Sequence, residues 1–149
     1  MQRIIRTLNQ KRGAQQYGKV AVGSEVAFAS PHRLVQMLME GALEKIATAK
    51  GHMNRKEFEP KGANINWAIS IIDGLRGSLN MQEGGEMANN LDSLYAYMVR
   101  RLAEANVNND IAILDEVTSL LLEIKSAWDA IPDEVKQPAS ADGKPVSAA

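Results

Sequence analysis

Two histidines, His32 and His52, are the imidazole groups of this chain that could bind a metal ion or accept a phosphoryl group. They are 20 residues apart in what the apolar spacing predicts to be one helix, which separates them by about 30 Å. They therefore cannot share a metal or a substrate. The chain has no cysteine, so disulfides, thiolate metal sites and cysteine nucleophiles are excluded.

His52 is the candidate for a second kind of chemistry, because histidine phosphotransfer proteins are four-helix bundles with an exposed histidine in the middle of a helix. Here Met53 and Asn54 follow it at a predicted helix end. The lysine and glycine that support such a histidine on its C-terminal side are missing. The sequence favours a solvated histidine at a helix end, and a histidine phosphotransfer protein stays open as an alternative.

Other side chains with catalytic potential have simpler explanations. Glu83 and Glu86 are placed where a helix N-terminus favours negative charge. Gly84 and Gly85 lack the Lys and Ser/Thr of a phosphate-binding loop, and the HExxH, GxGxxG and EF-hand patterns are absent. We therefore expect a protein that is not an enzyme, with no catalytic residue, metal or cofactor.

Four stretches with helical spacing of apolar residues must provide whatever function remains. Ser30 can cap the first helix and Pro31 suits its first position; the helix should end between Gly51 and Pro60. The second should begin near Pro60. The predicted core faces of these two helices are Val35, Leu38, Met39, Ala42, Ile46, Ala49 and Met53, and Ile65, Ala68, Ile69, Ile72, Leu75 and Leu79.

Asn80 is predicted to cap the third helix, with Glu83 as its capping partner. The fourth helix should run from about Asp110 to Ile131 and stop at Pro132. Their predicted core faces are Met87, Leu91, Leu94, Tyr95, Met98, Leu102 and Ala105, and Leu114, Val117, Leu121, Ile124 and Trp128. Because short breaks force sequential helices to turn back, we expect an all-α, antiparallel up-down four-helix bundle.

The two ends of the chain differ in composition from the predicted bundle. Residues 1–29 have basic residues and almost no acid, and we expect a mobile basic arm; a transit peptide or a membrane-surface helix is the alternative. Residues 30–131 should form the bundle, and residues 132–149 a disordered tail. The net charge of −1 and the lack of a long apolar run predict no nucleic-acid partner and no stable membrane insertion.

Some apolar residues lie beside the core faces rather than on them, next to small residues. A surface of large side chains and shallow hollows can accept a partner helix, although such residues can also widen the core. At 100° per residue, the positions assigned to this second surface are Leu34, Met37 and Gly41 on the first helix, Trp67, Ile71, Gly74 and Ser78 on the second, and Ile111 and Leu122 on the fourth.

Several runs of residues resemble one family over roughly residues 15–131. They are Tyr17, the run Ala29 to Leu38, Glu40-Gly41-Ala42, Lys61-Gly62, Ala68 to Leu75, Leu79-Asn80, Gly84 to Leu91, Leu94 to Met98, Leu102, Ala105-Asn106 and Ala127-Trp128. Their order and spacing resemble the FliS family of flagellin export chaperones.

The resemblance implies a cytoplasmic chaperone in flagellum biogenesis. It would bind the C-terminal segment of flagellin, prevent premature polymerisation and prepare delivery to the flagellar export gate. It also implies that Tyr17 lies over part of the binding surface. A generic helical protein-interaction domain remains the second alternative.

Overall fold

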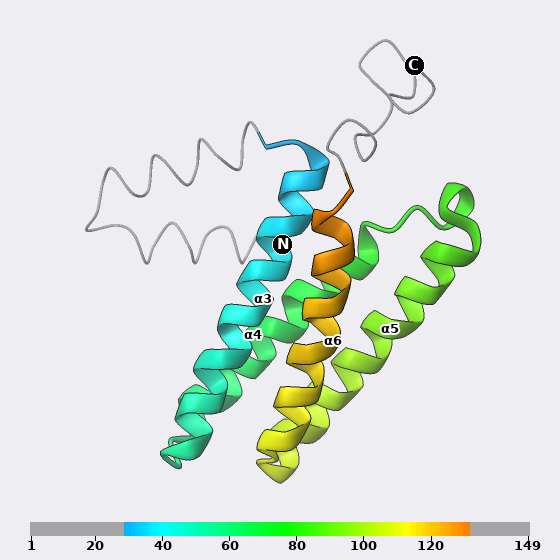
Figure 1. The fold of residues 1–149 in the computed structure, drawn as a ribbon. Coiled ribbons are helices and arrows are strands. Elements are labelled where there is room, and N and C mark those ends of the chain that lie inside the picture. Colours follow the sequence, from blue (N-terminus) through cyan, green and yellow to red (C-terminus); the bar gives the residue numbers. More distant parts are fainter. Residues whose placement is uncertain (1–28, 132–149) are drawn as a thin grey trace. The chain divides into compact units, whose positions relative to one another are not determined.

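The computed structural model describes residues 29–131, which form four α-helices and no strand (Figure 1). The helices are α3 (Pro31–Asn54), α4 (Phe58–Gly77), α5 (Met81–Asn108) and α6 (Ile111–Asp129). The predicted all-α four-helix class is confirmed. The predicted arm, with Tyr17, and the predicted tail lie outside the described residues. The described chain divides into two units, residues 29–37 with 126–131, and residues 38–125.

Local capping explains where two helices begin. The Ser30 hydroxyl accepts a hydrogen bond from the Arg33 amide at 3.1 Å, and the Asn80 side chain accepts one from the Glu83 amide at 3.0 Å. Each bond satisfies an amide that the first helical turn leaves without a partner. Asn80 Nδ2 also donates to Glu83 Oε2 at 3.2 Å. Both predicted caps are confirmed.

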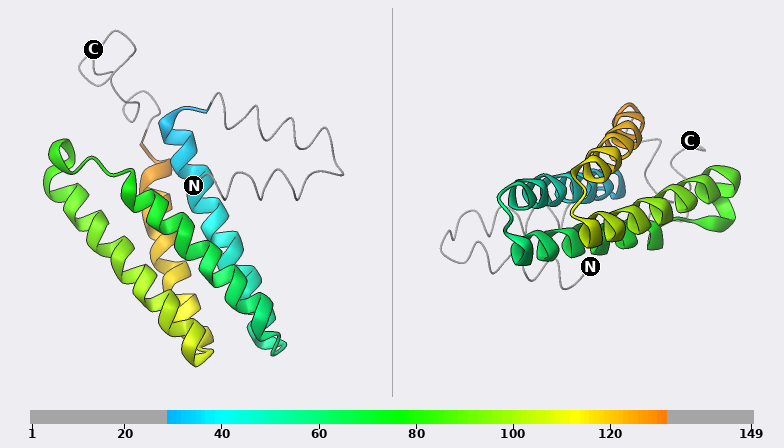
Figure 2. Two further views of the ribbon diagram at one scale, coloured as in Figure 1. Left: turned by 180° about the vertical axis from the view of Figure 1, so that it is seen from behind. Right: turned by 90° about the horizontal axis from the view of Figure 1, so that it is seen from below.

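Contacts between helices show that the part formed by residues 38–125 is an antiparallel bundle. Each neighbouring pair of helices is joined by polar or ring contacts: Lys45–Trp67 between α3 and α4, Lys61–Asn106 and Arg76–Asp92 between α4 and α5, Tyr97–Glu116 and Arg101–Glu116 between α5 and α6, and Glu40–Lys125 and Lys50–Asp115 between α6 and α3. Where two contacts join α3 to α6 or α4 to α5, residue numbers rise along one helix as they fall along the other. The two views in Figure 2 agree with this alternation.

The core of this unit is drawn from the predicted faces of all four helices. Its fully buried large side chains are Met39, Ile46, Ile65, Ile72, Leu75, Met98, Leu102, Leu114, Val117 and Leu121. Burial of each such side chain contributes roughly 1.5–3 kcal/mol relative to exposure. The periodicity of the sequence therefore identified most of the interior.

The start of α5 departs from the predicted regular helix. Gly85 has φ 54° and ψ −130°, so the first turn of α5 is separated from the rest by a kink. An L-residue rarely adopts this conformation. Met87 and Leu94, predicted on the core face, are 66% and 36% exposed. That prediction was wrong, because the buried face of α5 begins at Ala88 and continues through Tyr95 and Met98, and Met87 and Leu94 each lie one position before a buried residue.

The other unit, residues 29–37 and 126–131, is held together by a reciprocal pair. His32 Nε2 lies 2.9 Å from the Trp128 carbonyl oxygen, and Trp128 Nε1 donates to the His32 carbonyl at 3.0 Å. The two rings stack with centroids 5.1 Å apart. A carbonyl only accepts, so Nε2 carries the proton. His32 is thus a buried structural residue.

Candidate functional site

The candidate site is a surface between α3 and α4 in the unit of residues 38–125, and we call Gly41, Lys45, Trp67, Ile71 and Gly74 the α3–α4 surface. A Cβ placed on Gly41 would lie 3.5 Å from Ile71 Cδ1. One turn further along α3, Lys45 Nζ lies 3.8 Å from the Trp67 ring centroid. The two helices therefore contact each other at two successive levels, and α3 has no side chain at Gly41, next to Ile71.

The structure leaves most of the predicted binding residues at least partly accessible. Leu34 and Met37 are half-buried in the smaller unit, Gly41, Trp67, Gly74 and Ile111 are half-buried in the larger one, and Ser78 and Leu122 are exposed. Leu122, at 49%, is the most exposed of the predicted large apolar residues. The Ser78 hydroxyl donates to the Leu75 carbonyl at 2.7 Å, so Ser78 helps to end α4.

Ile71 requires a correction. It was expected on an exposed second face of α4 but is 2% exposed. The Ile71 methyl group is buried against α3 beside Gly41, where a Cβ would lie 3.5 Å from Ile71 Cδ1. A charged residue at this position would damage the core, so Ile71→Asp cannot serve as a clean test of partner binding.

Sequence patterns missed two buried lysines. Lys45 and Lys61 are each 5% exposed. Lys61 Nζ donates to the carbonyl and side-chain oxygens of Asn106 at 2.8 and 2.6 Å, which joins the start of α4 to the end of α5. A periodicity analysis treats lysine as a surface residue, so the only available signal was that each lysine adjoins an apolar core position.

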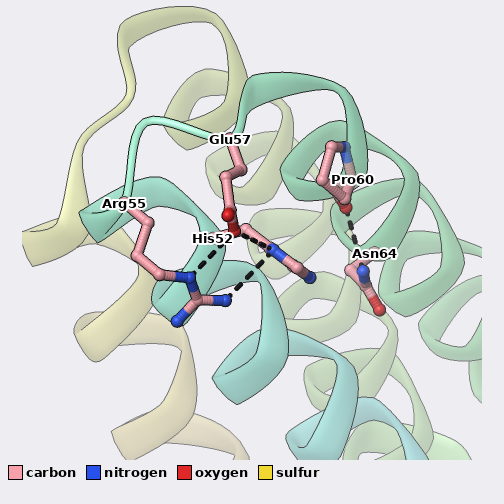
Figure 3. Close-up of polar contacts among 5 residues, drawn as sticks. All are labelled: His52, Arg55, Glu57, Pro60 and Asn64. Atoms are coloured by element: carbon pink, nitrogen blue, oxygen red, sulfur yellow. Dashed lines mark hydrogen bonds and ion pairs between the residues drawn. The ribbon is translucent and has the colours of Figure 1, made fainter.

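His52 lies in the last turn of α3, within a small polar cluster that includes residues of the connection to α4 (Figure 3). Its Nδ1 is 2.8 Å from Glu57 Oε1 and 3.2 Å from an Arg55 guanidinium nitrogen, and Arg55 Nε donates to the same carboxylate at 2.8 Å. Hydrogen bonds from His52 and Arg55 lower the pKa of Glu57. The cluster ties a helix-ending turn together, which is a structural use of the histidine rather than the mid-helix setting of a phosphoryl acceptor.

A second polar cluster fixes α5 against α6. Tyr97 donates to Glu116 Oε2 at 2.6 Å, and Arg101 donates to Glu116 Oε1 at 2.8 Å. These hydrogen bonds, with Tyr97 the larger contributor, hold the pKa of Glu116 below its ordinary value. The same bond, helped by partial burial, raises the pKa of Tyr97. The cluster has a structural role away from the α3–α4 surface.

Within residues 29–131, no group of three or more His, Cys, Asp or Glu is placed to hold a metal ion. In the same part of the chain, none of the helices has the length and apolar character needed to span a membrane. What these residues do present is a bundle whose helix faces include a half-exposed indole and an exposed leucine. Such a molecule belongs to the class of helical proteins that bind other chains.

The comparisons with known proteins narrow this class to one family. The profile of the family described as "Flagellar protein FliS" matches residues 13–135. The flagellar secretion chaperone FliSB of Pseudomonas aeruginosa is 52% identical over 120 residues, which are 80% of this chain and 95% of that protein. The flagellar secretion chaperones FliS of Vibrio cholerae and Salmonella typhimurium are 47% and 42% identical over 80% of this chain, and the matches span 88% and 89% of those proteins. The chain belongs to the FliS family.

Proposed function

We propose that this chain is a cytoplasmic chaperone for flagellin. It binds the C-terminal segment of flagellin before export, prevents premature polymerisation and presents the subunit to the flagellar export gate. The observation that carries the proposal is membership of a family whose relatives are named flagellar secretion chaperones. The accessible apolar groups of the bundle support it, because an unassembled chain end needs an apolar partner.

The α3–α4 surface supplies the proposed binding site. Trp67 is its large apolar group, and aromatic residues at the centre of an interface often carry much of its binding free energy. Gly41 of α3 has no side chain to keep another helix backbone at a distance. Leu122 of α6, which is 49% exposed, extends the apolar area that a wrapped segment can cover.

Coupled folding and binding explains how such a chaperone releases its client. Apolar area removed from water stabilises the complex by about 25 cal/mol per Å². Ordering a disordered segment costs roughly 1–2 kcal/mol for each backbone residue. Because the cost of ordering the segment cancels much of the stabilisation from apolar burial, the affinity is moderate despite a large contact area. A moderate affinity suits a protein that must hand its partner to an export machine.

Replacement of Trp67 tests the proposed site. We expect Trp67→Ala to weaken binding of a flagellin C-terminal peptide by about thirtyfold, the effect of a typical hot-spot residue, while the helical content by circular dichroism persists. Val107→Ala is the matched control, because Val107 is 79% exposed at the end of α5. Equal calorimetric affinities for the wild type and Trp67→Ala would remove Trp67 from the site.

A further inference from the structure

Lys45 is a charged residue in an unusual place. Its side chain is 6% exposed, and the neighbouring Glu44 carboxylate, 3.8 Å from Nζ, belongs to a side chain that is 72% exposed. Burying an ammonium group costs desolvation free energy, so the groups that surround Lys45 in the fold are of interest.

The geometry around Lys45 indicates what the charge contacts. Its ammonium nitrogen lies 3.8 Å from the centroid of the Trp67 ring, well within the range of a cation–π interaction, and tryptophan is the best aromatic partner for a cation. Lys45 comes from α3 and Trp67 from α4, so the contact crosses the helix pair. Next to this contact, α3 and α4 also approach each other at Gly41 and Ile71.

The indole ring of a half-exposed tryptophan can adopt more than one orientation. The torsion that turns an indole about its last side-chain bond has a broad energy profile, so the groups in contact with the ring decide its orientation. A cation held against one part of the ring face favours a single orientation. Fixing the ring before a partner arrives removes part of the ordering cost that binding would otherwise incur.

We propose that Lys45 is a positioning residue of the α3–α4 surface: its ammonium group holds the Trp67 indole in the orientation that a bound segment contacts. This inference rests on the proposed function for the identity of the partner. It does not require Lys45 to touch that partner. Loss of the charge should therefore act on binding through Trp67.

The first test uses the full-length chain without any partner. The two tryptophans are labelled with ¹⁵N in the indole ring, and the Trp67 signal is assigned as the one lost in Trp67→Leu. In Lys45→Met the Trp67 signal should shift, and its heteronuclear relaxation should show faster motion, whereas Lys45→Arg should preserve both properties because a guanidinium also stacks on aromatic rings. An unchanged Trp67 signal in Lys45→Met would overturn the proposal.

The second test is a double-mutant cycle with the flagellin C-terminal peptide. Lys45→Met should weaken binding about three- to tenfold in the wild-type background, and by less than about twofold in the Trp67→Leu background. The same loss in both backgrounds would overturn the inference, because Lys45 would then act without Trp67. Urea unfolding of each variant shows that the fold persists, and Lys45→Gln replaces Lys45→Met if the latter unfolds.

The two tests separate this inference from the proposed function. If the wild-type chain does not bind the peptide, the proposed function is wrong, and the indole signals alone decide whether Lys45 holds Trp67. If the wild type binds and Lys45→Met leaves both the Trp67 signal and the affinity unchanged, the proposed function stands and the positioning role is rejected.

Discussion

Gly41 shows how a single residue shapes the α3–α4 surface. A glycine inside a helix costs about 1 kcal/mol relative to alanine, so its presence in the middle of α3 needs a reason. The fold does not supply one, because a Cβ at this position would make an ordinary contact, 3.5 Å from Ile71 Cδ1. We therefore expect the reason to be a partner that packs closely against α3 at Gly41.

Replacement of Gly41 by alanine separates the effect of this glycine on stability from its effect on partner binding. We expect Gly41→Ala to raise the free energy of unfolding by about 0.5–1 kcal/mol and to weaken peptide binding severalfold, since the added methyl group obstructs a partner that packs closely against α3. Urea unfolding and calorimetric titration measure the two effects. Gly77→Ala is the control, because a Cβ there meets nothing within 4 Å. Unchanged peptide affinity in Gly41→Ala would show that the partner does not pack closely against Gly41.

At the same scale, the sequence could predict Trp67 but not its surroundings. The helical wheel placed Trp67 and Ile71 on one face, yet Ile71 is 2% exposed while Trp67 is half-buried. The difference depends on how closely α3 approaches each residue, which is a tertiary property. The contact of Lys45 with Trp67 was not predictable for the same reason, because only the fold brings an indole from another helix over the Lys45 ammonium group.

At the scale of the helices, boundaries set by local chemistry were predictable. Ser30 and Asn80 were identified as caps because their side chains act within three residues along the chain. The kink in α5 was not predictable, because Gly85 can adopt helical and non-helical angles equally well. Only the three-dimensional setting selects φ 54° at this glycine.

The kink gives a prediction for α5. In Gly85→Ala the backbone must keep a conformation that a side chain disfavours, at a cost of roughly 1–3 kcal/mol, or the first turn must detach. We expect a loss of unfolding free energy of this size and faster hydrogen exchange at the Glu83 amide, which the Asn80 side chain now holds. Wild-type stability together with wild-type exchange would contradict the kinked conformation.

At the scale of the whole described chain, periodicity predicted four helices and most of the core but not the pairing of individual residues across helices. That pairing depends on the relative sliding of helices, which apolar spacing does not specify. Glu116 is an example, because it lies on α6 yet meets Tyr97 and Arg101 of α5. Apolar spacing in the sequence gives no indication of this contact.

This cluster predicts how stability depends on pH. The pKa of Glu116 is lowered in the folded chain from an ordinary value of 4.5, so its ionised form stabilises the fold above that value and the contribution disappears as pH falls below it. The wild type should therefore exceed Glu116→Gln in stability at pH 7, and the difference should shrink below about pH 4.5. Urea unfolding between pH 3 and 7 measures this. A difference that is independent of pH would show that the carboxylate charge contributes nothing.

The most direct test of the central claim compares two forms of flagellin. The full-length chain is titrated calorimetrically with monomeric flagellin and with flagellin that lacks its C-terminal segment. We expect saturable binding to the intact monomer, with the negative heat-capacity change of apolar burial, and no binding to the truncated form. Equal affinity for both forms, or binding to neither, would contradict the account.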